Sequence, residues 1–402
     1  MKVALVCPAS LPATQFGGIV FLAVDLAREI SEMGHDVTIY TTDLDFSNGT
    51  DKFNKNLPHI EKFKKFKINR THAWFSFKLF FVNTSMYNEI KRDKPEIIHT
   101  IGLRSFQSII AWRISKKLGI PLILSDQGGL TTHPFLSESG ILLKMLYKVQ
   151  EFFIKHIINQ SSAISVGNEY EKEIFENLNN KSNVKIIRNG VNLKNLISTQ
   201  NFKKKYGIDS KFVLFVGRFS KVKGIRNLIL AWNNIKNEER FFDVNLVIMG
   251  VNFGYEKEME ELIQNLELSK RVFVIKNPPR EDVISAYGES EFLVFPSQWE
   301  LSPLTPLESF AFKKPVISTN AHGIPYTVKN NENGILVEPE NIEELSNALI
   351  KLLSDKSLRE KLGVAGYNFV HQECNCTSMA KNSLKLYEQV LRNNHNNREI
   401  SE

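Results

Sequence analysis

The sequence predicts an α/β protein made of two doubly wound, parallel-sheet domains. Its 402 residues exceed what one ordinary hydrophobic core supports, so two domains are expected. Residues 2–34 contain an apolar strand, a pair of glycines and an amphipathic helix, and residues 211–232 repeat that order. Strands that alternate with helices are typical of parallel sheets, which need helical crossovers between their strands.

Composition and charge narrow the class of protein. The formal net charge of +7 suits an anionic ligand, an anionic membrane face or nucleic acid, but the basic residues form no nucleic-acid recognition motif. No apolar run approaches a membrane span, and residues 1–10 resemble a strand more than a signal peptide. Cys7, Cys374 and Cys376 are badly spaced for disulfides or zinc. We therefore expect a cytoplasmic chain, with the inner face of the membrane as a candidate place of action.

The first βαβ unit carries two glycines at the start of its helix. Residues 2–7 form an unbroken apolar strand, the helix ends near Gly34, and residues 37–40 form the next strand. Gly17 and Gly18 allow close backbone approach, and the free N–H groups of a helix start favour negative charge. The two glycines suit either an anionic ligand or a tight turn without one.

The middle of the amino-terminal half combines basic and aromatic residues. Within residues 52–87 these include Lys62, Lys64, Lys65, Lys67, Arg70, Trp74, Phe75, Phe77, Phe80 and Phe81. This pairing suits contact with an anionic membrane surface. It also suits a basic edge strand followed by a helix whose aromatic residues face the core, which is where aromatic stripes usually lie.

Asp126 and Gln127 follow one of the later strands of this half. The strands expected here are residues 96–99, 121–125, 162–166 and 184–187, with a helix over residues 169–178. Asp126 can accept hydrogen bonds from ligand hydroxyl groups, or it can cap the helix ahead. The sequence favours neither role over the other.

The carboxyl-terminal half repeats the pattern of the first βα unit. After the strand at residues 211–216 come Arg218 and Lys223, beside a helix start. Two cations there can hold a diphosphate, or they can be ordinary solvated side chains. The remaining expected strands are residues 244–249, 271–277, 292–295 and 316–319, and the remaining helices are residues 282–287, 341–353 and 376–391. The polar tail from Asn393 is expected to fray.

Glu300 and Glu308 bracket the loop that follows the strand at residues 292–295. If Thr305 is the N-cap of the next helix, then Glu308 completes a capping box and needs no ligand. If Ser302 and Pro303 cap the helix instead, Glu308 lies one turn deeper and can reach outward. The separation of the two carboxylates does not suit the acid–base pair of a glycoside hydrolase.

Several of these segments, taken in order, resemble retaining glycosyltransferases of family 4, also called group 1. The resemblance rests on E-x7-E at Glu300 and Glu308, on G-R-x4-K-G at residues 217–224, and on N-G-V and N-G-x-L-V at residues 189–191 and 333–337. It implies the GT-B fold, in which two Rossmann-like domains face each other across a cleft and a C-terminal helix crosses back. The chain departs from the family pattern at Ile101, Leu301, Pro303 and Tyr326, and the usual histidine near the donor sugar is replaced by Asp126 or Gln127, with His133 further on.

The resemblance also implies roles for individual residues. Arg218 and Lys223 would hold the donor diphosphate, Glu300 the donor sugar and Glu308 the ribose. The expected catalytic residues are Arg218, Lys223, Glu300 and Asp126. The other expected substrate contacts are Gly17, Gly18, Gln127, Gly250, Val274, and the N–H groups of Leu304 and Thr305. Val274 and Gly250 lie where relatives meet the nucleotide base.

The implied activity is transfer of a hexose-type sugar from a nucleoside-diphosphate sugar to a glycan or lipid-linked acceptor. Retention of configuration is expected, without a metal or other cofactor, and a UDP-sugar is favoured over a GDP-sugar as donor. A nucleotide-sugar epimerase and a non-catalytic subunit are the alternatives. Residues 1–195 would bind the acceptor, residues 205–375 the nucleotide sugar, and residues 376–402 would return to the first domain and end in a polar tail.

Overall fold

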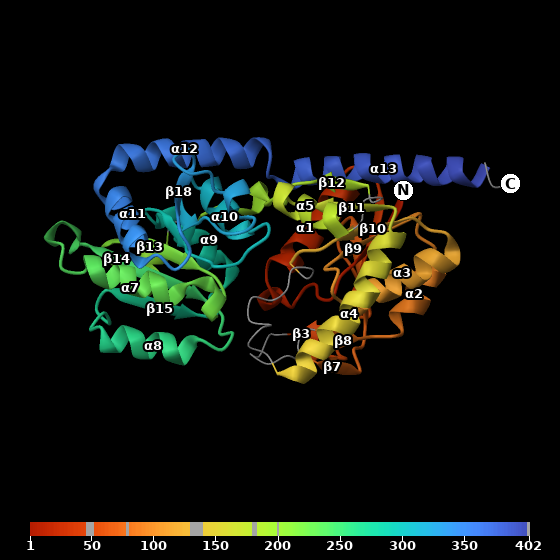
Figure 1. The fold of residues 1–402 in the computed structure, drawn as a ribbon, viewed down its shortest axis with the longest axis horizontal. Helices are drawn as coiled ribbons and strands as arrows, with labels where there is room; N and C mark the ends of the chain where they lie inside the picture. The colour runs from red at the N-terminus through yellow and green to blue at the C-terminus, as the bar shows by residue number, and fades with distance from the viewer. Residues whose placement is uncertain (46–51, 78–79, 129–139, 179–182, 199–200, 400–402) are drawn as a thin grey trace. The chain divides into compact units, whose positions relative to one another are not determined.

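The structure is a computed structural model that describes residues 1–45, 52–77, 80–128, 140–178, 183–198 and 201–399. Its internal contacts divide the chain into two units (Figure 1). Unit 1 comprises Met1–Asn189 with Cys376–Glu402, and unit 2 comprises Gly190–Asn375. Each unit is an α/β domain built on its own sheet, so the predicted pair of Rossmann-like domains is confirmed.

Unit 1 contains an eight-stranded sheet in the order β12-β11-β10-β9-β1-β2-β6-β5. Its strands are β1 (Lys2–Val6), β2 (Asp36–Thr42), β5 (Ile60–Lys62), β6 (Phe66–Thr71), β9 (Ile97–Ile101), β10 (Leu122–Ser125), β11 (Ala163–Val166) and β12 (Val184–Ile186). All neighbouring pairs are parallel except β5 and β6, which are antiparallel. The central strands are almost entirely buried because helices cover both faces of the sheet.

The two faces of this sheet carry separate cores. Val3 and Leu5 pack toward one core and Ala4 and Val6 toward the other, as the alternation of a strand requires. The helices are α1 (Gly18–Glu32), α2 (Met86–Asp93), α3 (Phe106–Leu118), α4 (Ile141–Gln160), α5 (Glu169–Leu178) and α13 (Cys376–Glu399). Sequence reasoning placed α1 and α5 but missed α3 and α4.

Helix α13 brings the end of the chain back to unit 1, as predicted. It packs on α1 in the first core, and Thr377 Oγ1 donates to Glu29 Oε2 at 2.7 Å. Tyr387 meets the buried His99, whose Nδ1 lies 2.6 Å from the phenol oxygen and whose Nε2 lies 2.8 Å from Ser125 Oγ. The helix continues to Glu399, so the expectation of a frayed tail from Asn393 is wrong.

Residues 52–87 contain extended segments. The alternative in which the aromatic residues face the core had expected them to lie on a helix. Besides β5 and β6 they form β4 (Lys52–Phe53), which pairs with β3 (Leu44–Asp45), and a hairpin of β7 (Phe75–Phe77) and β8 (Phe80–Val82). Phe81 is buried, whereas Trp74, Phe75 and Phe77 are exposed. Arg70 is buried, and its guanidinium donates to the carbonyl oxygens of Leu11 and Pro58, so it does not belong to a basic surface.

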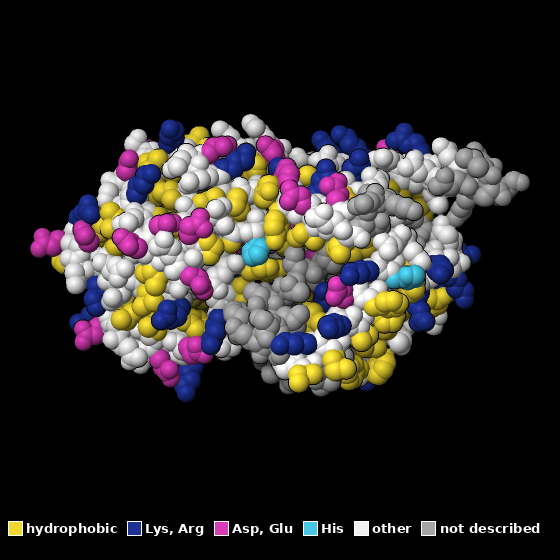
Figure 2. Space-filling view, viewed as in Figure 1, with side chains coloured by type: hydrophobic (Ala, Val, Ile, Leu, Met, Phe, Trp, Pro, Cys, Tyr) yellow, Lys and Arg dark blue, Asp and Glu magenta, His cyan; other side chains and the backbone are white. Residues whose placement is uncertain are grey.

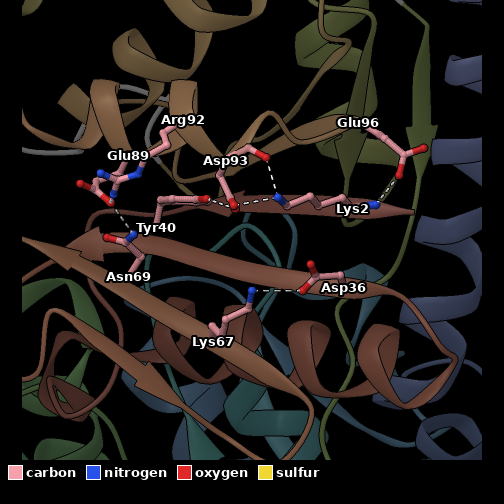
Figure 3. A network of polar contacts seen from close by, with 9 residues as sticks. All are labelled: Lys2, Asp36, Tyr40, Lys67, Asn69, Glu89, Arg92, Asp93 and Glu96. Carbon is pink, nitrogen blue, oxygen red and sulfur yellow. Dashed lines mark hydrogen bonds and ion pairs between the residues drawn. The ribbon is translucent and has the colours of Figure 1, made fainter.

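A polar network ties α2 to Lys2, at the start of β1, and to Tyr40 in β2 (Figure 3). Lys2 Nζ donates to Asp93 Oδ1 at 2.7 Å, and the Tyr40 hydroxyl donates to Asp93 Oδ2 at 2.5 Å. Burial alone would raise the pKa of Asp93, but the hydrogen bonds from Lys2 and Tyr40 outweigh burial and hold it below its ordinary value. The ionised carboxylate therefore stabilises the packing of α2 on the sheet.

Unit 2 contains a six-stranded parallel sheet in the order β15-β14-β13-β16-β17-β18. Its strands are β13 (Lys211–Val216), β14 (Val244–Gly250), β15 (Val272–Lys276), β16 (Leu293–Phe295), β17 (Val316–Thr319) and β18 (Gly334–Val337). Its helices are α6 (Phe202–Tyr206), α7 (Ile225–Ile235), α8 (Glu256–Asn265), α9 (Arg280–Glu289), α10 (Leu304–Ala311), α11 (Ile342–Ser354) and α12 (Lys356–Gln372). One core holds Val213 and Phe215 with α7, α8 and α11, and the other holds Phe212 and Leu214 with α9, α10 and α12.

Gly250 is explained by packing alone. A Cβ on Gly250 would lie 1.8 Å from the carbonyl oxygen of Gly217, where β14 passes the end of β13. The ligand contact expected at Gly250 is therefore not needed to account for the glycine.

We expect Gly250→Ala to lower the free energy of unfolding by about 2 kcal/mol or more, because the backbone at Gly217 must move aside. Chemical denaturation measures this loss. Gly140→Ala is the matched control, since its Cβ would meet no atom within 4 Å. Equal stability of both variants would contradict the close contact.

We expect Asp93→Asn to cost about 1 kcal/mol near neutral pH, a value kept small by partial exposure. Because the folded-state pKa of Asp93 is lowered, its contribution is complete above about pH 4 and is lost as the pH falls. The urea midpoints of wild type and variant should therefore converge in acid. Asp36→Asn, which affects an exposed pair with Lys67 at 3.5 Å, should change little at any pH.

Candidate functional site

In unit 2 the predicted cations and carboxylates meet at the carboxyl ends of two adjacent strands. Strand β13 pairs with β16, so the loops that follow them leave the same edge of the sheet. The loops are joined by hydrogen bonds from Gln298 N to Val222 O at 2.8 Å and from Ser297 Oγ to Val222 O at 3.3 Å. Lys223 and Glu300 are thereby placed side by side.

Gly224 sets how closely these loops approach. Its φ of +66° favours glycine, and a Cβ there would lie 2.0 Å from the carbonyl oxygen of Pro296. A larger residue would push the loop after β16 away from the start of α7. The glycine in the G-R-x4-K-G segment therefore has a structural reason.

Lys223 and Glu300 form an ion pair that is largely withdrawn from solvent, with side chains 12% and 17% exposed. Ser297 Oγ lies 3.2 Å from Glu300 Oε1, and Lys223 Nζ lies 5.4 Å from the centre of the Phe295 ring. Burial holds the pKa of Lys223 below its ordinary value; Glu300 opposes this shift, and the charge of Arg218 adds to it. Arg218 thus belongs to the same electrostatic cluster.

Arg218 itself is exposed, and its guanidinium lies over the ring of Phe253, 4.9 Å from the centre. The Phe253 backbone is fixed by its N–H bond to Phe219 O at 3.0 Å, and Phe219 N donates to Val251 O at 2.7 Å. Phe253 is a site residue that sequence reasoning missed, because nothing local marks an aromatic residue in a loop as a partner of a distant arginine.

Glu308 lies in the second turn of α10 and forms a two-fold contact with Arg280. Arg280 Nη1 donates to Glu308 Oε2 at 3.1 Å, and Nη2 donates to Oε1. Helix α10 begins at Leu304 with Pro303 as N-cap and has no side-chain capping bond, so the capping box built on Thr305 is wrong. Glu308 is therefore free of a capping role, as the alternative with an earlier helix start required.

Arg280 was also missed, although the sequence held a signal for it. It is the first residue of α9, where the helix dipole disfavours a cation, so a carboxylate partner was to be expected. Tyr287, on the same helix, is fully buried, and burial together with the charge of Glu308 raises its pKa well above its ordinary value. The phenol beside Glu308 is therefore neutral.

Two further predicted residues of unit 2, Leu304 and Thr305, lie at this edge, whereas Val274 lies in the middle of β15. Leu304 and Thr305 are the first residues of α10, whose leading N–H groups lack partners within the helix. Val274 is half-buried on β15, the strand at one end of the described sheet order.

The predicted residues of unit 1 lie at the carboxyl ends of its strands and at the start of α1. Gly17, with φ +110°, is the N-cap of α1, and Gly18 is its first residue. Asp126 directly follows β10 and is buried. Gln127 has φ +53° and exchanges two hydrogen bonds with the amide of Asn189, at 3.1 and 3.2 Å.

Asp126 does not cap the next described helix, because α4 begins at Ile141 with Gly140 as its N-cap. The interpretation of Asp126 as a helix cap is therefore not supported in the described part of the chain. His133 lies outside the described residues.

Two family models match the chain in succession. Residues 16–195 match the model described as Glycosyltransferase Family 4, and residues 198–369 match the model described as Glycosyl transferases group 1. The chain is 27% identical over 355 residues to an uncharacterized glycosyltransferase of Methanocaldococcus jannaschii, covering 88% of this chain and 89% of that protein.

A second relative carries a more specific name. The chain is 29% identical over 311 residues to the Escherichia coli UDP-Gal:alpha-D-GlcNAc-diphosphoundecaprenol alpha-1,3-galactosyltransferase, covering 71% of this chain and 75% of that one. Among solved structures, sucrose-phosphate synthase from Thermosynechococcus elongatus has a TM-score of 0.79 at 20% identity, covering 97% of this chain and 99% of that chain. The fold is therefore GT-B, and the chain belongs to the group 1 glycosyltransferases.

Proposed function

We propose that the protein transfers a hexose-type sugar from a nucleoside-diphosphate sugar to a hydroxyl group of a glycan or lipid-linked acceptor, with retention of configuration. One observation carries the proposal: Lys223, Glu300 and Arg218 form a single charged cluster at the carboxyl edge of the unit 2 sheet. A diphosphate needs cations and a sugar needs hydrogen-bond acceptors, and this cluster offers both.

Arg218 and Lys223 stabilise the negative charge that grows on the departing diphosphate. Lys223 acts with particular strength because its ammonium is largely removed from water, where charge interactions are weaker. An ammonium has three donors, so Lys223 can keep Glu300 in place while it also binds a phosphate oxygen.

Glu308 accepts hydrogen bonds from the ribose of the nucleotide. Arg280 occupies one lone pair on each carboxylate oxygen and leaves others for the ribose hydroxyls. The two-fold contact also fixes the orientation of the carboxylate before a ligand arrives. Leu304 and Thr305 N–H groups meet phosphate at the start of α10.

In the transfer step, the acceptor oxygen bonds to the anomeric carbon while the bond from that carbon to the phosphate oxygen breaks. The acceptor proton passes to the departing phosphate on the same face of the sugar, so no protein nucleophile is required. In unit 1, the hydroxyl groups of the sugar and the acceptor are bound by Asp126, Gln127, Gly17 and Gly18. In unit 2, Val274 contacts the base.

Similarity to the E. coli enzyme supports a UDP-sugar donor and a lipid-linked acceptor, because its name specifies both. The exposed aromatic residues of the basic stretch, Trp74, Phe75 and Phe77, provide a contact for the inner face of a membrane. No helix in the described residues is long and apolar enough to cross a bilayer.

The central test combines donor binding with turnover. A thermal-shift screen of UDP-, GDP- and ADP-sugars identifies the donor, because tight binding raises apparent stability. With that donor and a lipid-diphosphate acceptor, Arg218→Ala should lower kcat/KM by about 100-fold or more. Arg240→Ala is the control, since Arg240 also lies over a ring, that of Phe241, at 4.8 Å. We expect Glu308→Gln to weaken donor binding as well.

Two results would overturn the proposal. Isomerised donor in the absence of acceptor would favour an epimerase, and no donor consumption with any acceptor would favour a non-catalytic subunit. Wild-type turnover in Arg218→Ala would remove the site assignment.

We also expect turnover to persist in excess chelator, because Arg218, Lys223 and helix N–H groups neutralise the diphosphate. Initial rates with and without the chelator should agree within about twofold, since a bound metal commonly supplies several kcal/mol to such a reaction. Loss of activity that only a divalent cation restores would contradict the metal-free mechanism.

A further inference from the structure

Helix α4 exposes an apolar stripe on its outer side. The residues are Ile141, Met145, Val149, Phe152 and Phe153, with 79%, 60%, 58%, 72% and 44% of their surface exposed. Their spacing of three to four residues places them along one side of the helix. Exposure of five large apolar side chains in a row calls for a physical reason, since single exposed apolar residues are ordinary but contiguous patches are not.

The stripe is separate from the surface that holds α4 on the domain. Ile154, Ile157 and Ile158 are buried in the core of unit 1 on the other side of the helix. Arg104 lies over the Tyr147 ring at 4.7 Å, and Trp112 Nε1 donates to Gln160 Oε1 at 2.8 Å. Helix α4 is thus anchored between Tyr147 and Gln160 while the stripe stays outside.

Lysine side chains border the stripe. Lys144, Lys148 and Lys155 are exposed and, at 100° per residue, fall on one flank of it. The sequence of α4 contains a single carboxylate, Glu151, which pairs with Lys155 at 3.0 Å. The helix therefore presents an apolar stripe with net positive charge at its edge.

The β7–β8 hairpin adds aromatic residues to the same part of unit 1. Phe80 packs edge-on against Phe106 of α3, and Arg104, just before α3, hydrogen-bonds Gln150 of α4 at 3.4 Å. Figure 2 shows hydrophobic atoms gathered over the region that Figure 1 labels α4, β7 and β8, with Lys and Arg atoms beside them. Trp74, Phe75 and Phe77 are the exposed aromatic side chains there.

We propose that this α4 face, made of the five-residue stripe, the three lysines and the three hairpin aromatic residues, binds the surface of a bilayer that contains anionic phospholipid. The apolar side chains enter the boundary between headgroups and acyl chains, and the lysines meet lipid phosphates. A second copy of the chain fits less well, because a two-fold contact through this face would bring the same cations together.

The proposal extends the membrane contact of Trp74, Phe75 and Phe77 to α4, and its test does not rest on the transferase activity, because binding to lipid vesicles requires neither donor nor acceptor. It also assigns a partner to a helix that the sequence did not mark. Where the acceptor is lipid-linked, the face would hold the enzyme at the surface in which that acceptor lies.

Vesicle flotation of the full chain tests the proposal. We expect binding to phosphatidylcholine vesicles that contain about 30% phosphatidylglycerol, and binding at least about tenfold weaker to phosphatidylcholine alone or at high salt. Failure of the wild-type chain to float with the anionic vesicles would overturn the proposal.

Matched variants distinguish binding through the α4 face from nonspecific adsorption of other exposed apolar or basic residues to the vesicles. Val149→Ser with Phe152→Ser should reduce flotation about tenfold or more. Val364→Ser with Phe242→Ser, two exposed apolar residues of unit 2, should not. Likewise, replacing Lys144, Lys148 and Lys155 by glutamine should abolish the preference for anionic lipid, whereas the same change at the exposed Lys257, Lys356 and Lys361 should leave it intact.

Other outcomes would count against the membrane. Equal flotation of the stripe variant and its control would place the contact elsewhere. Conversion of a dimer to a monomer by the stripe variant, without any change in flotation, would identify the face as a contact between copies. Circular dichroism and donor-induced thermal shift, which should match wild type in every variant, show that the fold and the donor site are intact.

Discussion

The site in unit 2 depends on the close contact between Gly224 and Pro296. Parallel strands β13 and β16 bring two loops to one edge of the sheet, but strand pairing alone does not fix how closely the loops approach each other. The missing side chain at Gly224 lets the loop after β16 approach the start of α7, and the bonds to Val222 O hold it there. Lys223 and Glu300 then meet away from water, where their charges interact strongly.

Both carboxylates of the E-x7-E segment are paired with cations of the same unit. Glu300 meets Lys223, and Glu308 meets Arg280, which begins α9 against the preference of the helix dipole. Such pairing removes the cost of isolated charges at a partly buried site and orients the side chains before a ligand arrives. A ligand group that binds either carboxylate must therefore share these cations or replace them.

In unit 1, helices α13 and α4 each pack into one of the two cores, and α4 also carries an exposed apolar stripe. Helix α13 closes one core, and its Tyr387 meets a His99 whose pKa burial lowers to about 3, so this polar contact is between neutral groups. On the opposite face of the sheet, α4 contributes isoleucines to the second core while its outer stripe stays exposed. Helix α4 thus has two apolar sides. One is buried in the second core, and the other is exposed.

The returning helix and the meeting of Lys223 with the carboxylate loop were implied by the resemblance to family 4 glycosyltransferases, whereas the sequence by itself determined the two α/β domains and most strands. It could do so because buried strands are apolar runs and because glycines and charges lie within short segments. Tertiary structure decided the ion pair of Arg280 with Glu308 and the position of Arg218 over the ring of Phe253. It also decided the paired amides of Gln127 and Asn189, and the exposure of α4. Those contacts join residues 28 or more positions apart, and the Gln127 pair spans 62. Chain folding sets such distances through strand order and helix packing, which local patterns do not encode. The local capping-box pattern at Thr305 was also misleading, because α10 begins at Leu304 with Pro303 as its N-cap and has no side-chain capping bond.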